Sequence, residues 1–252
     1  MAKPQAIKSV QRSKKISMCV YGAPGSGKTR LAGTGGEGTL IVRPPTDHTD
    51  SIRTQGVEEW EVHDWSEMLN VHEYLRHDGA KDFDWVWLDS ISLFQDTGLD
   101  DIWAGVIAAK PHRAEWGLDR GEYNVNMWRL QQWVRHVVGI PGFHFGVTAH
   151  PAEIPNPVSG EVKLAPWVQG KNMSQKVQGY MNMVAYLEVV VDKEGETRRV
   201  LRTKGDERYE AKDQFDAFPN GRLSDPTIDK IVESINATRT PRSTRKPKRK
   251  AA

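Results

Sequence analysis

The sequence contains one phosphate-binding pattern, G-x-x-x-x-G-K-[ST], which is met by the consecutive residues Gly22-Ala23-Pro24-Gly25-Ser26-Gly27-Lys28-Thr29. Glycines in such a loop let the backbone turn tightly, so that several N–H groups point at one anion. The apolar run at residues 16–21 predicts a buried strand before the loop, and a helix is expected to begin near Lys28 with its positive end facing the anion. The three elements predict a P-loop, in which Lys28 reaches the β- and γ-phosphates of ATP and Thr29 ligates Mg²⁺.

Asp89 is the second candidate for the same chemistry. It follows the apolar residues 83–88, which predict a buried strand, and an acid at the carboxyl end of such a strand is the Walker B pattern, where it holds Mg²⁺ or its water. Asp89 lies 61 residues after Lys28, which leaves room for intervening strands. This spacing favours an ATPase core over a small kinase, and Asp89 is predicted to share Mg²⁺ with Thr29.

His150 is a candidate sensor of the γ-phosphate. It follows residues 143–149, which predict another strand, and ligands of parallel sheets bind at the carboxyl ends of the strands. The alternative is a structural histidine that is hydrogen-bonded to a turn.

Alternating strands and helices predict an α/β fold, with a mostly parallel central sheet that is flanked by helices. Further strands are expected at residues 39–42, 60–62 at the sheet edge, 183–191 and 197–203, the last two forming a C-terminal β-hairpin. Further helices are expected from a Ser66 cap to His77, after residue 91, over an apolar stripe at 125–137, from Ser174, and at 226–235. Trp128 and Trp133 belong to that stripe and are predicted to lie in the core.

Two segments mix basic and aromatic residues. Residues 110–121 include Trp116 and can hold phosphates and stack a base of single-stranded nucleic acid, although a subunit contact or a surface cover fits equally well. Residues 151–170 contain four prolines and predict a long loop, with Lys163, Trp167 and Lys171 in or beside it. Loops of this length are usually functional or disordered.

The charge of the chain is divided unevenly. Residues 1–15 carry five basic side chains and residues 236–252 carry seven, with no acid in either segment, whereas the whole chain has a net charge of +2. The body between the two segments is therefore acidic. We expect a basic N-terminal arm over 1–15, an ATPase domain over 16–235 and a basic disordered tail over 236–252. Basic arms on a nucleotide-binding body favour a polyanionic partner, with a solubilising tail as the alternative.

Cys19 is the single cysteine of the chain and lies in the first predicted strand, where a small buried side chain is expected. One cysteine excludes an intrachain disulfide and fits a reducing cytoplasm. The sequence shows no apolar signal segment and no membrane-spanning run, so a cytoplasmic protein without a membrane partner is expected.

The order of these motifs resembles the phage-encoded RecA-like ATPases of the core-only type, which act in single-strand annealing and recombination. The resemblance rests on the P-loop, on residues 85–90 and 145–150, and on Tyr209-Glu210-Ala211-Lys212-Asp213. It implies ATP and Mg²⁺ as cofactors, a homo-oligomer in a ring or filament, single-stranded DNA as partner, and a single-strand-binding protein as a further partner. It places the protein in the cytoplasm of a bacterial host. Lys212 resembles a lysine that RadA-type relatives project into the ATP site of the neighbouring subunit.

Two positions depart from that family. Its second strand commonly ends in an acid that polarises the attacking water, but here the strand ends in Val42-Arg43-Pro44-Pro45. The water-activating base is then Asp47, Asp50 or absent, and hydrolysis is expected to be slow or to need DNA. Gln214 stands where the family often has an arginine, so the site in trans is expected to rely on Lys212 alone.

Two other functions fit the same motifs. One is a DNA helicase or helicase-loader ATPase, which would need a docking surface for its partner. The other is a nucleotide-switched DNA-binding module with little hydrolysis.

Overall fold

The structure is a computed structural model that describes residues 15–155, 160, 162–170 and 172–239. Its main element is a mixed sheet with the strand order β11-β9-β8-β1-β5-β4-β2-β3. The six strands from β8 to β3 are mutually parallel. They comprise β1 (Ser17–Tyr21), β2 (Thr39–Arg43), β3 (Glu58–Glu61), β4 (Trp85–Leu88), β5 (His144–Ala149) and β8 (Met183–Val191). The predicted fold class, a mostly parallel α/β sheet, is confirmed.

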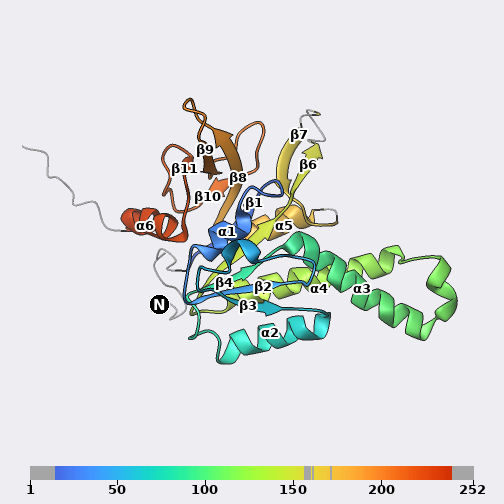
Figure 1. Cartoon of the computed structure of the whole chain (residues 1–252). Helices are drawn as coiled ribbons and strands as arrows, with labels where there is room; N and C mark the ends of the chain where they lie inside the picture. Colours follow the sequence, from blue (N-terminus) through green and yellow to red (C-terminus); the bar gives the residue numbers. More distant parts are fainter. Residues whose placement is uncertain (1–14, 156–159, 161, 171, 240–252) are drawn as a thin grey trace, which may run out of the picture.

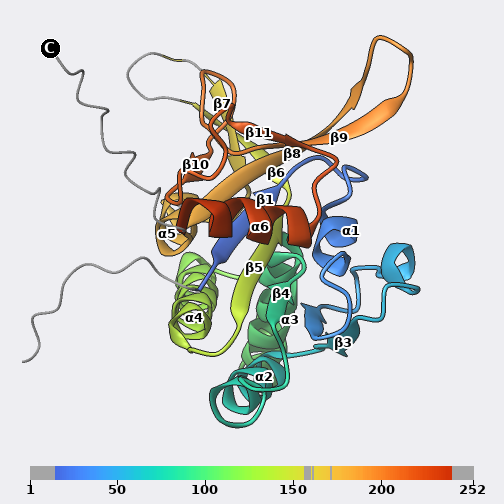
Figure 2. The same ribbon diagram turned by 90° about the vertical axis from the view of Figure 1, so that its left-hand side faces the viewer.

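The predicted C-terminal hairpin is also present. Strand β9 (Thr197–Arg202) pairs antiparallel with β8, and β10 (Lys212–Asp213) and β11 (Arg222–Ser224) add short antiparallel strands to β8 and β9. Figure 2 shows the β8–β9 hairpin extending beyond the rest of the sheet.

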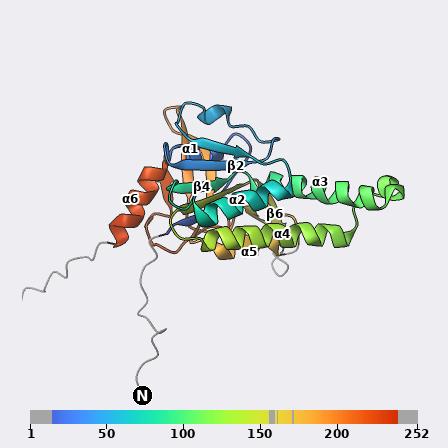
Figure 3. The same cartoon turned by 90° about the horizontal axis from the view of Figure 1, so that it is seen from below.

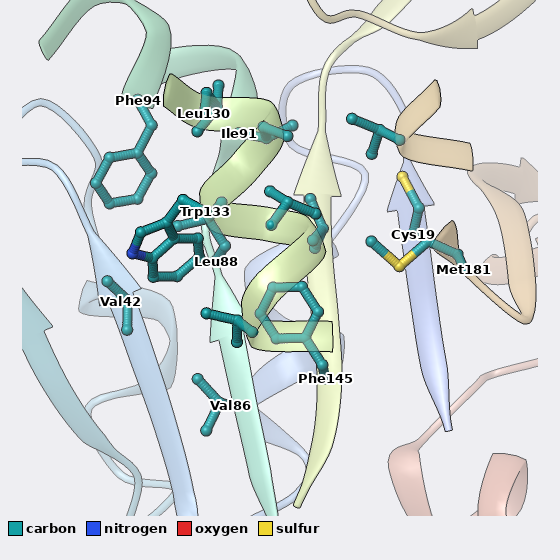
Figure 4. Close-up of a cluster of buried hydrophobic side chains, with 14 of the residues drawn as sticks. Cys19, Val42, Val86, Leu88, Ile91, Phe94, Leu130, Trp133, Phe145 and Met181 are labelled. Carbon is teal, nitrogen blue, oxygen red and sulfur yellow. The ribbon is translucent and has the colours of Figure 1, made fainter. Parts of the chain in front are cut away.

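Helices cover both faces of the sheet (Figure 1). They are α1 (Lys28–Gly33), α2 (Trp65–His77), α3 (Ile91–Ala109), α4 (Arg120–Gly139), α5 (Met173–Tyr180) and α6 (Ile228–Arg239), with 3₁₀ turns η1 (Asp50–Ile52) and η2 (Pro111–Glu115). Neighbouring residues of a strand point to opposite faces, so Cys19 packs with α2 to α5 and Val20 packs with α1 and α6. This two-sided burial explains why the inner strands β1, β2 and β4 are mostly apolar, whereas the edge strand β3 carries three glutamates. Figure 4 shows the first of these cores, in which Trp133 and Leu130 lie over Phe145, Val86 and Leu88.

Helices α3 and α4 form a long hairpin that projects from the body (Figures 1 and 3). Trp133 is buried at 3% exposure, as predicted, but Trp128 is 63% exposed. The prediction of a core position for Trp128 is therefore wrong, because it lies on the face of α4 opposite the buried face that carries Asn126, Leu130 and Trp133. No helix of the described residues has the length and apolarity that crossing a bilayer requires.

Three further expectations are corrected. Residues 151–170 are not a simple loop, because β6 (Pro151–Pro155) and β7 (Val162–Pro166) pair as an antiparallel hairpin. The cap of α2 is Asp64 rather than Ser66, since the Asp64 carboxylate accepts a hydrogen bond from the Glu67 N–H at 2.9 Å. Helix α6 continues to Arg239, four residues beyond its predicted end. The disorder expected of residues 236–252 is therefore wrong for 236–239, which are helical, and it stays a prediction for 240–252. Residues 1–14 and Lys171 also lie outside the described residues.

Gly146 illustrates how tightly the sheet packs. It lies on β5 directly opposite Trp87 of β4, and a methyl group added at Gly146 would overlap the Trp87 indole. The Trp87 ring is fully buried and stacks on Trp85 with 5.5 Å between ring centroids. The missing side chain of Gly146 therefore makes the room that this indole occupies.

We predict that Gly146→Ala lowers the free energy of unfolding by about 1–3 kcal/mol, because a close-packed core has no space for the added methyl group. Urea denaturation measures this change. The matched control is Gly139→Ala at the end of α4, where no atom lies within 4 Å of the added methyl group and the stability should change by less than about 1 kcal/mol. Equal stability of Gly146→Ala and wild type would contradict this account of the packing.

Candidate functional site

The loop between β1 and α1 has the geometry of an anion cradle. Gly25 and Gly27 adopt φ values of 78° and 97°, which an L side chain rarely tolerates. Helix α1 begins directly at Lys28, and the Gly27 carbonyl accepts its first hydrogen bond from the Leu31 N–H at 2.8 Å. The free N–H groups at the start of α1 therefore point toward the loop, as the P-loop prediction requires.

Lys28 is folded into this loop. Its ammonium donates hydrogen bonds to the Gly22 carbonyl at 2.9 Å and to the Ala23 carbonyl at 3.1 Å, and the residue is only 8% exposed. Burial lowers the pKa of Lys28, while the negative charges of Asp89 and Asp47 raise it. The ammonium is thus held beside the loop with two carboxylates near it.

Asp89 directly follows β4 and is 2% exposed. Its carboxylate accepts hydrogen bonds from the hydroxyls of Thr148 and Thr29. Burial raises the pKa of Asp89 and the charge of Asp47 raises it further, whereas the two hydroxyls and Lys28 lower it. Asp89 and Thr29, which were predicted as metal ligands, are therefore in direct contact.

The donor set of this contact fits Mg²⁺. A hydroxyl oxygen and a carboxylate oxygen lie together beside the P-loop, and Mg²⁺ in nucleotide sites takes one or two protein oxygens, with phosphates and water as its other ligands. Among the described residues, no cluster of three or more His, Cys, Asp or Glu side chains forms a separate metal centre.

His150 follows β5 at the same edge of the sheet. Its backbone N–H donates to the Ser92 hydroxyl at 2.9 Å, and its carbonyl accepts from the Trp167 N–H at 2.7 Å. Burial lowers the pKa of His150, the positive charge of Lys28 lowers it further, and the charge of Asp47 raises it. The imidazole therefore lies near the P-loop and favours its neutral form.

Of the two candidate bases, only Asp47 is close to these groups. Asp47 acts on the pKa values of Lys28, Asp89 and His150. Asp50 instead opens the 3₁₀ turn η1 and lines a separate surface cavity. The strand end that lacks the usual acid is occupied by Arg43, which pairs with Glu59 at 3.1 Å.

Lys212 lies apart from the P-loop of its own subunit. Lys212 lies on β10 opposite Val184 of β8. The end of β1, where the P-loop begins, is aligned with Tyr186, two residues further along β8. Burial lowers the pKa of Lys212, and no charged group adds to this shift. The structure therefore brings Lys28, Thr29, Asp89 and His150 together and leaves Lys212 outside the group.

The segments with mixed basic and aromatic residues differ in their surroundings. Trp116 follows η2 at the end of the projecting hairpin and is 79% exposed. Lys163 lies on β7, and Trp167 directly after β7 is 39% exposed.

The β6–β7 hairpin is connected to the site by hydrogen bonds. The Ser92 hydroxyl, three residues after Asp89, accepts from the His150 N–H before the hairpin and donates to the Trp167 carbonyl after it at 2.9 Å. One helical turn later, the Gln95 side chain accepts from the Gln169 N–H. Both ends of the hairpin are thus held by the start of α3, directly after Asp89.

Arg199 of β9 is a residue at the site that the sequence did not single out. Its Nε donates to the Ser26 carbonyl of the P-loop at 3.2 Å. Period-two alternation on β9 could have grouped Arg199 with the buried Leu201, but it could not have indicated which element that face meets.

Comparison with known proteins gives a family and two similar folds. The family model of the AAA domain matches residues 14–215. The structure is similar to that of the RadB recombinase, with a TM-score of 0.46 and 17% identity over 77% of this chain and 81% of the other. It is also similar to the flagellar accessory protein FlaH from Methanocaldococcus jannaschii, with a TM-score of 0.39 and 12% identity over 83% of this chain and 88% of the other. No curated protein matches the sequence significantly.

The raised pKa of Asp89 leads to a prediction about stability in the absence of nucleotide. The folded protein binds the Asp89 proton more tightly than the unfolded chain does, so the ionised carboxylate destabilises the fold. The resulting loss of folding stability begins as pH rises past about 4, the ordinary pKa of aspartate, and is complete above the raised pKa of Asp89. Asp89→Asn cannot ionise. At pH 7 it should therefore be more stable than wild type, by up to about 1.4 kcal/mol for each pH unit of the shift.

Thermal unfolding of both proteins from pH 4 to pH 8 measures this difference. Asp84→Asn, an exposed acid at the opposite end of β4, should show no such gain. A stability difference between Asp89→Asn and wild type that does not grow with pH would show that Asp89 is not buried as an ionised group.

Proposed function

The chain belongs to the AAA domain family, and we propose that it is a RecA-like ATPase that acts on single-stranded DNA in recombination or strand annealing, of the type that phages encode. The observation that carries the proposal is the group of Lys28, Asp89, Asp47 and His150 around a P-loop of anion-binding geometry. In this proposal residues 16–235 are the ATPase domain, and residues 1–15 and 236–252 are basic segments that contact DNA.

In the proposed reaction the P-loop amides and Lys28 bind the phosphates of ATP, and Thr29 and Asp89 hold Mg²⁺. The metal ion, when bound, neutralises charge on the β- and γ-phosphates. Asp47 takes a proton from the attacking water, whose oxygen bonds to the γ-phosphorus while the bond to the β,γ-bridging oxygen breaks. ADP and phosphate are the products. The neutral imidazole of His150 hydrogen-bonds the γ-phosphate and is the sensor of its presence.

The β6–β7 hairpin is the proposed route from nucleotide to DNA. His150 precedes the hairpin, and the hydroxyl of Ser92 holds both of its ends, so a shift of His150 toward a γ-phosphate would be passed to the hairpin. Trp167 and Lys163 offer a ring for stacking and a cation for phosphate at this hairpin, and Trp116 offers a second ring on the projecting hairpin. We further propose a homo-oligomer on the single-stranded DNA, with a single-strand-binding protein as an additional partner.

One observation favours a second candidate, a nucleotide-switched DNA-binding module with little hydrolysis. The end of β2 carries Arg43, held by Glu59 and Glu61, in place of an acid that could activate water. In that case Asp47 would have no catalytic role, and ATP binding alone would change the affinity for DNA.

We predict that Lys28→Ala lowers ATP hydrolysis by about a hundredfold or more, because the backbone amides alone leave the charge of the γ-phosphate uncompensated. Steady-state release of phosphate, with and without single-stranded DNA, measures the change. The matched control is Lys81→Ala, which removes an exposed lysine before β4 and should leave the rate unchanged. Hydrolysis at the wild-type rate in Lys28→Ala would refute the ATPase site, and nucleotide-dependent DNA binding without hydrolysis in wild type would support the switched module.

The proposed role of Lys212 predicts complementation between subunits. Lys212→Ala lacks the residue that acts on the neighbour, and Lys28→Ala lacks its own site, so each should be inactive alone. A mixed oligomer contains sites with an intact P-loop and an intact Lys212 from the neighbour, and part of the ATPase activity should return. A mixture that forms oligomers on single-stranded DNA and stays inactive would contradict action in trans.

A further inference from the structure

The hairpin strand β9 carries two adjacent arginines in different surroundings. Arg198 is exposed and pairs with Asp192 at 2.7 Å and with Asp225 at 3.6 Å. Arg199 points to the opposite face of the strand, the face that buries Leu201 against α1 and α6. Its side chain therefore turns toward the P-loop and not toward solvent.

The Arg199 guanidinium lies against the part of the loop where α1 begins. Its Nε donates to the Ser26 carbonyl at 3.2 Å, and a Cβ built on Gly27 would be 2.5 Å from that Nε. Within the described residues, no carboxylate forms an ion pair with Arg199. One nitrogen is thus used to hold the side chain on the loop, and the two terminal nitrogens have no anionic partner there.

The backbone of Arg199 is fixed as well. Its N–H donates to the Asp225 carboxylate at 3.2 Å, and its carbonyl accepts from the Asp225 N–H at 2.7 Å. The register on β8 places Arg199 opposite Val189, two residues beyond Leu187, whose carbonyl lies against Gly22. The guanidinium is therefore positioned by the hairpin from the side of β8, across the loop from His150.

A cavity of about 230 Å³ adjoins this guanidinium. Gly27 and Arg199 line it together with a second arginine, Arg30, one acid, Asp225, and the apolar side chains of Leu31, Leu187 and Pro226. An anion that is bound at the start of α1 and continues into this cavity would pass the terminal nitrogens of Arg199.

We propose that Arg199 binds the phosphates of the nucleotide in its own subunit, so that the β8–β9 hairpin supplies one side of the nucleotide site. This inference rests on the proposed ATPase function. The physical basis is that a guanidinium presents a planar fork of donors to phosphate oxygens and remains charged at any working pH. A cation beside the loop without a carboxylate partner also adds to the attraction for polyphosphate.

The test compares Arg199→Ala, Arg199→Lys and the matched control Arg198→Ala in the full-length protein. We expect Arg199→Ala to weaken binding of ATP and ADP by about 10- to 100-fold, the loss expected for a charge-assisted hydrogen bond. Arg199→Lys should recover part of this loss because it keeps the charge without the fork. Arg198→Ala should bind as wild type does, since Arg198 faces away from the loop.

Competition by inorganic tripolyphosphate, which has no base, separates phosphate binding from a structural role. If Arg199 contacts phosphate, tripolyphosphate should displace a fluorescent ATP analogue about tenfold less effectively from Arg199→Ala than from wild type. The salt dependence of the affinity should also become weaker. Unchanged affinity of Arg199→Ala for ATP, or weaker ATP binding with unchanged tripolyphosphate affinity, would overturn the proposal.

Different results would refute the proposed ATPase function and the proposed role of Arg199. If wild type binds no nucleotide and Lys28→Ala behaves identically, the ATPase assignment is refuted. If wild type binds ATP, Lys28→Ala does not, and Arg199→Ala binds as wild type does, only the role of Arg199 is refuted.

Discussion

The pairing of β1 between β5 and β8 is the interaction on which the candidate site depends. The register aligns Tyr21 with Ala149 on one side and with Tyr186 on the other, and the Gly22 N–H donates to the Ala149 carbonyl at 3.3 Å. Parallel strands end at the same edge of a sheet, so the P-loop, His150 and the hairpin that carries Arg199 meet at one place. Strand β4 lies beyond β5, and the hydroxyl of Thr148 on β5 bridges to Asp89.

Burial of two opposite charges shifts the pKa values of the groups at this site. Lys28 and Asp89 are both nearly inaccessible, and desolvation is the largest cause of the shift in the pKa of each. Charges in a low-dielectric interior cost stability unless they are paired and hydrogen-bonded. The loop carbonyls and the two threonine hydroxyls offset part of this cost. The rest remains in the nucleotide-free protein, as is common where a site is built to bind a charged ligand.

The outer elements are attached to this site by a few side chains. The Tyr21 hydroxyl, one residue before the P-loop, shares its one proton between the carbonyls of Leu164 on β7 at 2.8 Å and of Glu210 before β10 at 2.7 Å. Ser92 and Gln95 hold the two ends of the β6–β7 hairpin from the other side. A rearrangement at the loop therefore has direct hydrogen-bonded routes to the hairpin and to the segment that carries Lys212.

The sequence by itself determined the fold class and the separate parts of the site. The glycine spacing of residues 22–29 specifies an anion-binding turn, and the mostly apolar runs before Gly22, Asp89 and His150 specify strands that are buried on both faces. These signals are local, because backbone conformation and burial on both faces of a strand are recorded within a few consecutive residues. The carboxyl-end positions of Asp89 and His150 followed from them.

Only the tertiary structure decided which residues meet. Asp47 could not be preferred over Asp50 until the turn after β2 was placed beside Asp89, and Arg199 is 173 residues from the Ser26 carbonyl that it contacts. The pairing of β6 with β7 could not be predicted from a proline-containing segment, and the exposure of Trp128 depends on which face of α4 the neighbouring elements cover. The physical reason is that strand order and the packing of the elements set these contacts. Periodicity along the chain reports that a residue has a buried face, but it does not report which element covers that face.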